Sequence, residues 1–258
     1  MKKPLINFLL ALACIIALSA PASAEWFADL YVGPSFTQSE DVVISQPGFK
    51  ATLKDVEFAN SVSFGGRLGY WFESTPYIGF ALDASHFRPD MKKQQVTGCF
   101  SGPAAVDFGI NGCDPANPLS LVRIDLAVTG ISFDALLRWP LLTSKEFPKG
   151  KLQPYLTVGP TIFVARAKDT SKNSSLSPNF IPPGQSETDT SVVVKAGTGI
   201  AWQFHQNVAL FGEYRFTHFA PKFDFKNLDA ITGVGTVSFP MKTDINTHRA
   251  VFGISLRY

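Results

Sequence analysis

Residues 244–258 alternate between apolar and polar side chains with a period of two. Tyr258, Leu256, Ile254, Phe252 and Ala250 lie on one parity, and small, polar or charged residues lie on the other. Such alternation predicts a β-strand whose two faces contact different surroundings.

Seven further segments alternate in the same way, so the sequence predicts eight strands. The eight predicted strands are 26–37, 61–72, 77–88, 121–139, 152–166, 190–204, 208–219 and 244–258. The segment 121–139 changes phase, because its apolar residues are at even positions up to Val128 and at odd positions from Ile131. A one-residue slip of this kind predicts a β-bulge at Thr129-Gly130.

The connections between these strands alternate in length. The long ones follow every second strand and are predicted as external loops at 38–60, 89–120, 167–189 and 220–243. The others are shorter, at 73–76, 140–151 and 205–207. An even number of strands with short turns at one end predicts an all-β, eight-stranded antiparallel up-and-down barrel that crosses a membrane.

The alternation alone leaves open which face of the barrel is apolar. A soluble barrel such as a lipocalin has the same pattern with its apolar face turned inward. Two features favour the membrane version. Trp26, Trp139 and Trp202 all fall on the apolar parity near the short turns, as in an interfacial aromatic girdle. Charges of both signs lie on the polar parity, at Asp29, Arg67, Asp83, Asp134, Arg138, Lys195, Glu213 and Arg215.

The first 24 residues have the features of a secretory signal peptide. Lys2 and Lys3 precede an apolar run at 5–20, and Ala-Ser-Ala at 22–24 fits a cleavage site. The expected mature barrel domain is therefore 25–258. Removal of the signal lowers the basic residues from 23 to 21, equal to the 21 acidic ones. A neutral chain lacks the excess positive charge with which proteins bind nucleic acid.

The cysteines support the same interpretation. Cys14 lies inside the signal and raises the alternative of a lipoprotein, but position 11 is Ala where a lipoprotein signal prefers Leu. Cys99 and Cys113 lie in one Gly-, Pro- and Asn-rich stretch, and in an exported protein such a pair predicts a disulfide. A loop of this size would be stabilised by roughly 3 kcal/mol.

The sequence resembles the OmpA-like and opacity-type family of small outer-membrane β-barrels. The matching segments are 30–33 (LYVG), 153–159 (QPYLTVG), 211–217 (FGEYRFT) and 248–258 (HRAVFGISLRY). The resemblance implies Sec-type export to the outer membrane of a Gram-negative-type cell and contact with its lipid and lipopolysaccharide. It also implies delivery by periplasmic chaperones and recognition by the barrel-assembly machinery of a C-terminal signal formed by Phe252, Ile254, Leu256 and Tyr258.

The family includes anchors, adhesins and channels, so the resemblance leaves the function open. Buried charges must pair, and the narrow interior of an eight-stranded barrel predicts a plug of ion pairs. We therefore expect a structural or surface-interaction, adhesin-like role, with a host or surface ligand bound through the external loops. The alternative is a small channel for ions or small apolar molecules.

An enzyme that modifies lipid A is a third hypothesis. His86, His218 and His248 fall on the lipid-facing parity near the outer rim, but the sequence places no serine nucleophile suitably beside them. Contact between these histidines and lipopolysaccharide phosphates is the simpler interpretation. We expect no catalytic residue, metal site or cofactor.

Overall fold

The computed structural model describes residues 25–121, 123–169, 185–228 and 236–258. The predicted signal peptide at 1–24 and Val122 lie outside the described residues. So do 170–184 and 229–235, which belong to two of the predicted loops.

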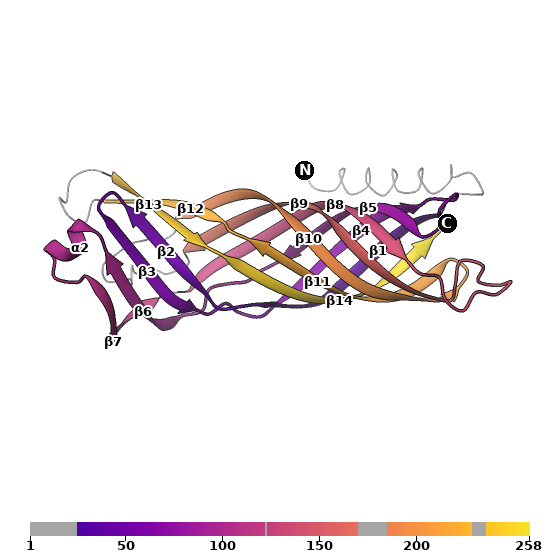
Figure 1. Ribbon diagram of the computed structural model, residues 1–258, viewed down its shortest axis with the longest axis horizontal. Coiled ribbons are helices and arrows are strands. Elements are labelled where there is room, and N and C mark those ends of the chain that lie inside the picture. The colour runs from indigo at the N-terminus through magenta and orange to yellow at the C-terminus, as the bar shows by residue number, and fades with distance from the viewer. Residues whose placement is uncertain (1–24, 122, 170–184, 229–235) are drawn as a thin grey trace, which may run out of the picture.

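Eight antiparallel strands form one closed barrel, as the sequence predicts (Figure 1). They are β1 (Glu25–Thr37), β4 (Ser61–Trp71), β5 (Ile78–Phe87), β8 (Ile124–Arg138), β9 (Leu152–Asp169), β10 (Ser186–His205), β11 (Val208–Phe219) and β14 (Ile245–Arg257). The first and last strands pair with each other and close the barrel, with Phe27 opposite Arg257 and Val32 opposite Phe252. All eight predicted strands are confirmed, although β9 and β10 extend farther into the 167–189 connection than expected.

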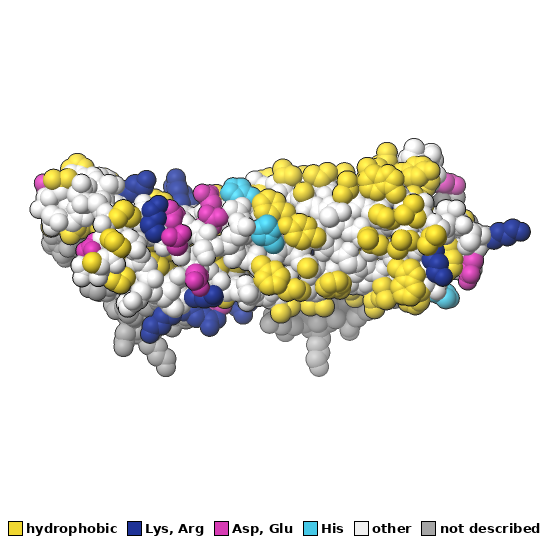
Figure 2. Space-filling model, turned by 60° about the horizontal axis from the view of Figure 1, so that its bottom comes forward, with side chains coloured by type: hydrophobic (Ala, Val, Ile, Leu, Met, Phe, Trp, Pro, Cys, Tyr) yellow, Lys and Arg dark blue, Asp and Glu magenta, His cyan; other side chains and the backbone are white. Residues whose placement is uncertain are grey.

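The outward faces of these strands form a continuous apolar belt. Figure 2 shows hydrophobic side chains covering this part of the surface, with histidines at its border and charged side chains beyond it. Leu30 is 74% exposed and Leu68 62% exposed. Trp26, Trp139 and Trp202 also point outward, as predicted for the girdle. No helix in the described part of the chain is long and apolar enough to span a membrane.

A second sheet of six strands, here called the distal sheet, lies beyond the barrel at the end away from the girdle (Figure 1). In spatial order it contains β12 (Lys222–Leu228), β13 (Thr236–Thr243), β2 (Glu40–Gln46), β3 (Phe49–Val56), β6 (Gln94–Ser101) and β7 (Gly112–Leu121). The short helix α2 (Pro103–Asp107) connects β6 to β7. Three of the connections predicted as loops, 38–60, 89–120 and 220–243, therefore contain regular strands.

The predicted disulfide is confirmed within this sheet. Cys99 of β6 and Cys113 of β7 are directly opposite each other and are bonded. The bond joins the two strands on either side of α2, so it closes the hairpin that carries the helix.

The distal sheet and the far ends of the barrel strands enclose a hydrophobic core, which we call the distal core. Barrel strands and their ends contribute Phe87, Ile124, Leu126, Val128, Phe163, Ala165, Ala167, Phe219 and Ile245, and the rest of the distal region contributes Val42, Ile44, Ala51, Leu53, Val56, Phe58, Met91, Val96, Leu121, Phe223, Phe225 and Met241. Phe87, Phe163 and Phe219 pack against one another with ring centroids 5.0–6.4 Å apart.

The distal core corrects the predicted β-bulge at Thr129-Gly130. Strand β8 keeps an unbroken register with both neighbours across this point, and its burial alternates without a slip. Val128 is buried in the distal core, whereas Ile131 is 58% exposed on the belt. The apolar residues change parity because the surroundings exchange sides: the apolar environment is outside the barrel at the belt and inside it at the distal core.

A charge placed in the belt should destabilise the barrel far more than the same charge on the distal sheet. Phe133 lies on β8 between Thr129 and Trp139 and is 52% exposed. Phe133→Arg should lower the free energy of unfolding by about 2–4 kcal/mol, because the guanidinium would face hydrocarbon. The measurement is the urea midpoint at which the fast-migrating folded band disappears from unboiled SDS gels.

Gln95→Arg is the matched control, because Gln95 is exposed on β6 of the distal sheet, next to the buried Val96. It should change stability by no more than about 0.5 kcal/mol. Equal losses in the two variants would contradict the assignment of the belt to lipid.

Candidate functional site

The barrel interior is the candidate site, and small residues create the space for its large side chains. A Cβ atom at Gly199 would lie 2.6 Å from Cζ of Tyr155, and one at Gly65 would overlap the hydroxyl end of Tyr31. Glycine at these positions therefore permits two inward-pointing tyrosines to lie among the charged residues.

All eight charged side chains that the sequence predicts for the interior are buried, each with 4% or less of its surface exposed. Seven of them form one continuous chain of ion pairs, here called the central network. Its members are Asp29, Arg67, Asp83, Asp134, Lys195, Glu213 and Arg215.

Arg67 and Arg215 connect the central network across the barrel. Arg67 Nε donates to Asp29 Oδ2 at 2.8 Å, and its Nη1 donates to Glu213 Oε2 at 2.9 Å. Arg215 Nε donates to Glu213 Oε1 at 2.7 Å, and its Nη1 lies 3.1 Å from Asp83 Oδ2. Glu213 is therefore shared by two guanidinium groups, one from β4 across the barrel and one from its own strand β11.

Lys195 and the two tyrosines extend the central network. Lys195 Nζ lies 2.7 Å from Asp134 Oδ2 and 3.4 Å from Asp83 Oδ1. Tyr31 Oη donates to Asp83 at 3.0 Å, and Tyr155 Oη donates to Glu213 at 2.8 Å. Charge-assisted hydrogen bonds of this kind are about twice as strong as neutral ones.

Arg138, the eighth predicted residue, belongs to a separate group near the girdle, here called the girdle network. Its Nη2 donates to Glu25 Oε2 at 2.5 Å, and its Cζ lies 4.2 Å from the Trp71 ring centroid. Arg257 Nη1 lies 3.4 Å from Glu25 Oε1 and donates to Gln153 Oε1 at 2.6 Å. The two networks fill the barrel at two levels.

A cavity of about 20 Å³ separates the two networks. Its lining includes Asp29, Arg67, Arg138, Gln153 and Arg257. A volume of this size holds about one water molecule. The cavity is thus far smaller than a passage for a hydrated ion.

Several interior residues escaped the sequence prediction. Glu25 directly follows the predicted cleavage site, which obscured its membership in β1. Arg249 and Arg257 are at polar positions of the last strand. Their parity alone could have indicated that both point into the barrel. Tyr31 and Tyr155 are also at inward-facing positions of their strands. The sequence does not indicate which carboxylate each of their hydroxyl groups binds.

The three histidines lie on the outside of the barrel, on the predicted parity. His86 Nδ1 is 3.0 Å from Thr129 Oγ1, and His218 Nδ1 is 2.9 Å from Asn246 Oδ1. His248 Nδ1 is 2.5 Å from Tyr214 Oη. Within the described residues, no group of three or more His, Cys, Asp or Glu side chains could hold a metal ion.

The predicted C-terminal signal residues also face outward. Phe252 is 62% exposed, Ile254 50%, Leu256 42% and Tyr258 54%. They form the belt beside the seam between β1 and β14. Their recognition by the assembly machinery stays a prediction.

A closed barrel with an apolar exterior and a charged interior agrees with one protein family. Residues 10–257 match the family described as "Outer membrane protein beta-barrel domain". The chain belongs to this family. No curated protein matches the sequence.

Solved structures of outer-membrane barrels resemble this one at low sequence identity. Outer membrane protein OprG from Pseudomonas aeruginosa has a TM-score of 0.51 at 12% identity, with 92% of this chain and 96% of OprG covered. Neisserial surface protein A has a TM-score of 0.48 at 12% identity, with coverages of 93% and 100%. AlkL has a TM-score of 0.46 at 13% identity, with 93% of each chain covered. The likeness to OprG shows a shared fold.

Removal of one shared carboxylate should strongly destabilise this outer-membrane barrel. Glu213→Gln would leave Arg67 and Arg215 each without one of its buried carboxylate partners. We expect the free energy of unfolding to fall by about 3–5 kcal/mol, measured from the urea midpoint of the folded band.

The control is Asp41→Asn on the distal sheet. Asp41 pairs with Lys54, and these side chains are 40% and 44% exposed, respectively. Loss of this pair should cost no more than about 1 kcal/mol. If the two variants lost similar amounts of stability, the central network would not hold the interior together.

Proposed function

We propose that this protein is a non-conducting, non-catalytic outer-membrane barrel that displays the distal sheet as a rigid surface for interaction outside the cell. The observation that carries the proposal is the continuous filling of the molecule. The two ion-pair networks occupy the barrel, and the distal core occupies the region above it.

The closure of the barrel consists of two different barriers in series. An ion in the barrel would have to displace Arg67 from both Asp29 and Glu213, which are buried contacts. It would then enter the distal core at Phe87, Phe163 and Phe219, where an unpaired charge is strongly disfavoured. Apolar molecules would meet the charged networks instead. The closed state therefore disfavours passage of both solute classes.

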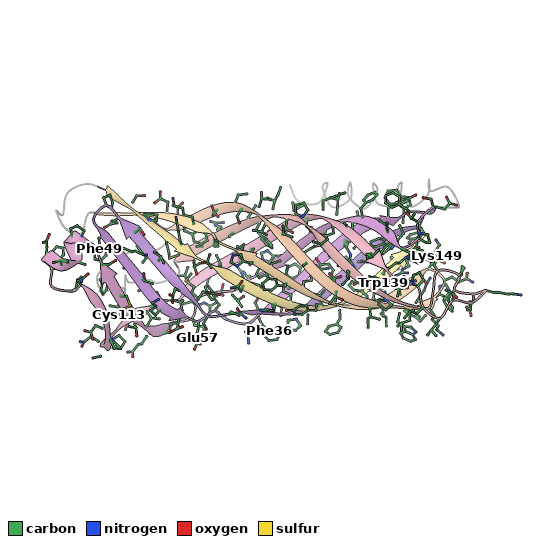
Figure 3. The ribbon with its side chains drawn as sticks, in the orientation of Figure 1. Phe36, Phe49, Glu57, Cys113, Trp139 and Lys149 are labelled. Carbon is green, nitrogen blue, oxygen red and sulfur yellow. A yellow bond between two sulfur atoms is a disulfide. The ribbon has the colours of Figure 1, made fainter. Side chains whose placement is uncertain are left out.

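The position of the girdle supports an external location for the distal sheet. Trp139 lies near Lys149 at one end of the molecule, whereas Phe49 and Cys113 lie near the other end (Figure 3). In outer-membrane barrels the short turns face the periplasm and the long connections face outward. The belt would then contact outer-membrane lipid and lipopolysaccharide.

The distal sheet has features of a rigid display surface. The Cys99–Cys113 disulfide closes the hairpin that bears α2. Within this helix Val106 is 62% exposed, and just after it Phe108 is 59% and Ile110 44% exposed. Exposed apolar side chains on an ordered element can bind a partner without the entropic cost of ordering a flexible loop.

The edge strand β7 is poorly suited to pairing with a strand from another protein. It contains Pro115 and Pro118, which lack a backbone N–H group, and most of its residues are exposed. Prolines at sheet edges hinder the addition of further strands. A ligand would therefore contact side chains of the distal sheet and α2 more readily than the β7 backbone.

Planar-bilayer recordings test the proposed closure. The wild-type barrel should produce no steady single-channel steps, because the networks and the distal core block the route. Steady wild-type steps that disappear or change size in Arg67→Met or Glu213→Gln would support the channel hypothesis and overturn the proposal. Steps that are identical in all three proteins would identify a contaminating porin, which an independently purified sample must remove.

The disulfide should matter for the display surface and little for the barrel. In the double variant Cys99→Ser with Cys113→Ser, proteolysis within residues 102–112 should become faster, since the hairpin loses a constraint of roughly 3 kcal/mol. The gel shift between boiled and unboiled samples should persist. A double variant as protease-resistant as the oxidised wild type would contradict the role of the disulfide in holding α2.

A further inference from the structure

Arg249 of β14 is buried inside the barrel, between the central network and the distal core. Its Nη1 donates a hydrogen bond of 3.3 Å to Ser85 Oγ, and its Cζ lies 4.9 Å from the Phe87 ring centroid. Its Nε and Nη2 have no hydrogen-bond partner. Among the described residues, no carboxylate lies within ion-pair distance of Arg249, unlike the other buried cations.

The surroundings of Arg249 contain further polar groups without partners. By register, Arg249 is directly opposite Arg215 on one neighbouring strand and Ser35 on the other. Directly opposite residues have their Cβ atoms about 5 Å apart. Arg215 Nη2, Ser35 Oγ and Thr217 Oγ1 are buried and lack hydrogen-bond partners. Unused donors of two arginines and one hydroxyl group thus gather at one level of the barrel, with Thr217 at the next inward position along β11.

The charge balance of the interior points in the same direction. Among the described residues, the buried interior charges are five carboxylates and six cations, namely Glu25, Asp29, Asp83, Asp134 and Glu213 against Arg67, Arg138, Lys195, Arg215, Arg249 and Arg257. Arginine stays protonated in proteins. A buried cation without a counter-charge is strongly unfavourable.

The girdle end of the barrel differs from the surroundings of Arg249. There, Arg138 and Arg257 share Glu25 with Lys149, whose side chain is 44% exposed, so solvent reaches that network. Arg249 is enclosed by the central network on one side and by the Phe87 cluster of the distal core on the other. Solvent therefore screens its charge least.

We propose that Arg249, with Arg215, Ser35 and Thr217, binds a small monovalent inorganic anion such as chloride inside the barrel. The anion is monovalent because the excess charge is one, and it is small because the central network on one side and the distal core on the other leave little space. A water molecule could accept hydrogen bonds from the free N–H groups, but it would not balance the positive charge of Arg249. The site does not depend on whether the barrel conducts or binds a partner.

A comparison of two salts tests the proposal. The full-length mature protein is folded from urea into detergent in sodium chloride or in sodium gluconate at equal ionic strength, since gluconate is too large for the site. If chloride is present at about 100 times its Kd, the temperature at which the fast-migrating band is lost should be higher by several degrees. Arg249→Met removes the charge while retaining much of the volume, and it should abolish this difference.

Arg257→Met is the matched control, because Arg257 is also buried but contacts Glu25. This variant should be less stable than the wild type in both salts and should keep the chloride-dependent shift. Equal stability of the wild type in chloride and gluconate would overturn the proposal. A chloride response of Arg249→Met equal to that of the wild type would do the same.

Crystals of the wild type grown in sodium bromide provide a direct test that does not require a folded variant. An anomalous peak within hydrogen-bond distance of Arg249 Nε or Nη2 is the expected result. Density at this place without anomalous signal would mean water, and a peak only beside the exposed Lys149 would mean a surface ion. Either outcome would overturn the proposal.

Discussion

The structure depends on one constraint: each barrel strand has only two faces, and its inward face crosses two different environments. At the belt, the apolar surroundings are outside, so the inward positions carry charges such as Arg67 and Glu213. Beyond the belt the strands extend into the distal region, where the apolar residues must turn inward. Strand β8 shows this change without any slip in register, from exposed Ile131 to buried Val128.

The interior of the belt region follows from the same constraint. Charges placed inside a narrow barrel lose much of their solvation, so ion pairs offset the cost of burying them. Glu213 meets two arginines and a tyrosine, and Asp83 meets Arg215, Lys195 and Tyr31. Except for Glu213–Arg215, which lies within β11, these contacts connect different strands of the barrel. They fill the barrel interior while connecting its strands, which links its stability to the proposed absence of conduction.

The sequence contained enough information for the barrel strands, the orientation of the belt and the disulfide. Each of these depends on local parity or on a chemical rule that holds for any exported chain. The distal sheet was harder to predict because its three hairpins are joined to one another by pairs of strands that are far apart in sequence. β13 pairs with β2 through Met241 and Ile44. Glu25 was missed because it directly follows the predicted cleavage site, and Arg249 was missed although its parity on the last strand points inward.

By itself, the sequence determined which residues alternate, and hence the eight strands, the belt with its tryptophan girdle and the inward placement of eight charges. The tertiary structure alone decided where along the strands the apolar environment changes from the outside of the barrel to its inside. It also decided which charges meet. The physical reason is that alternation is a property of one strand, whereas burial and ion pairing depend on the closed barrel and the sheet packed above it.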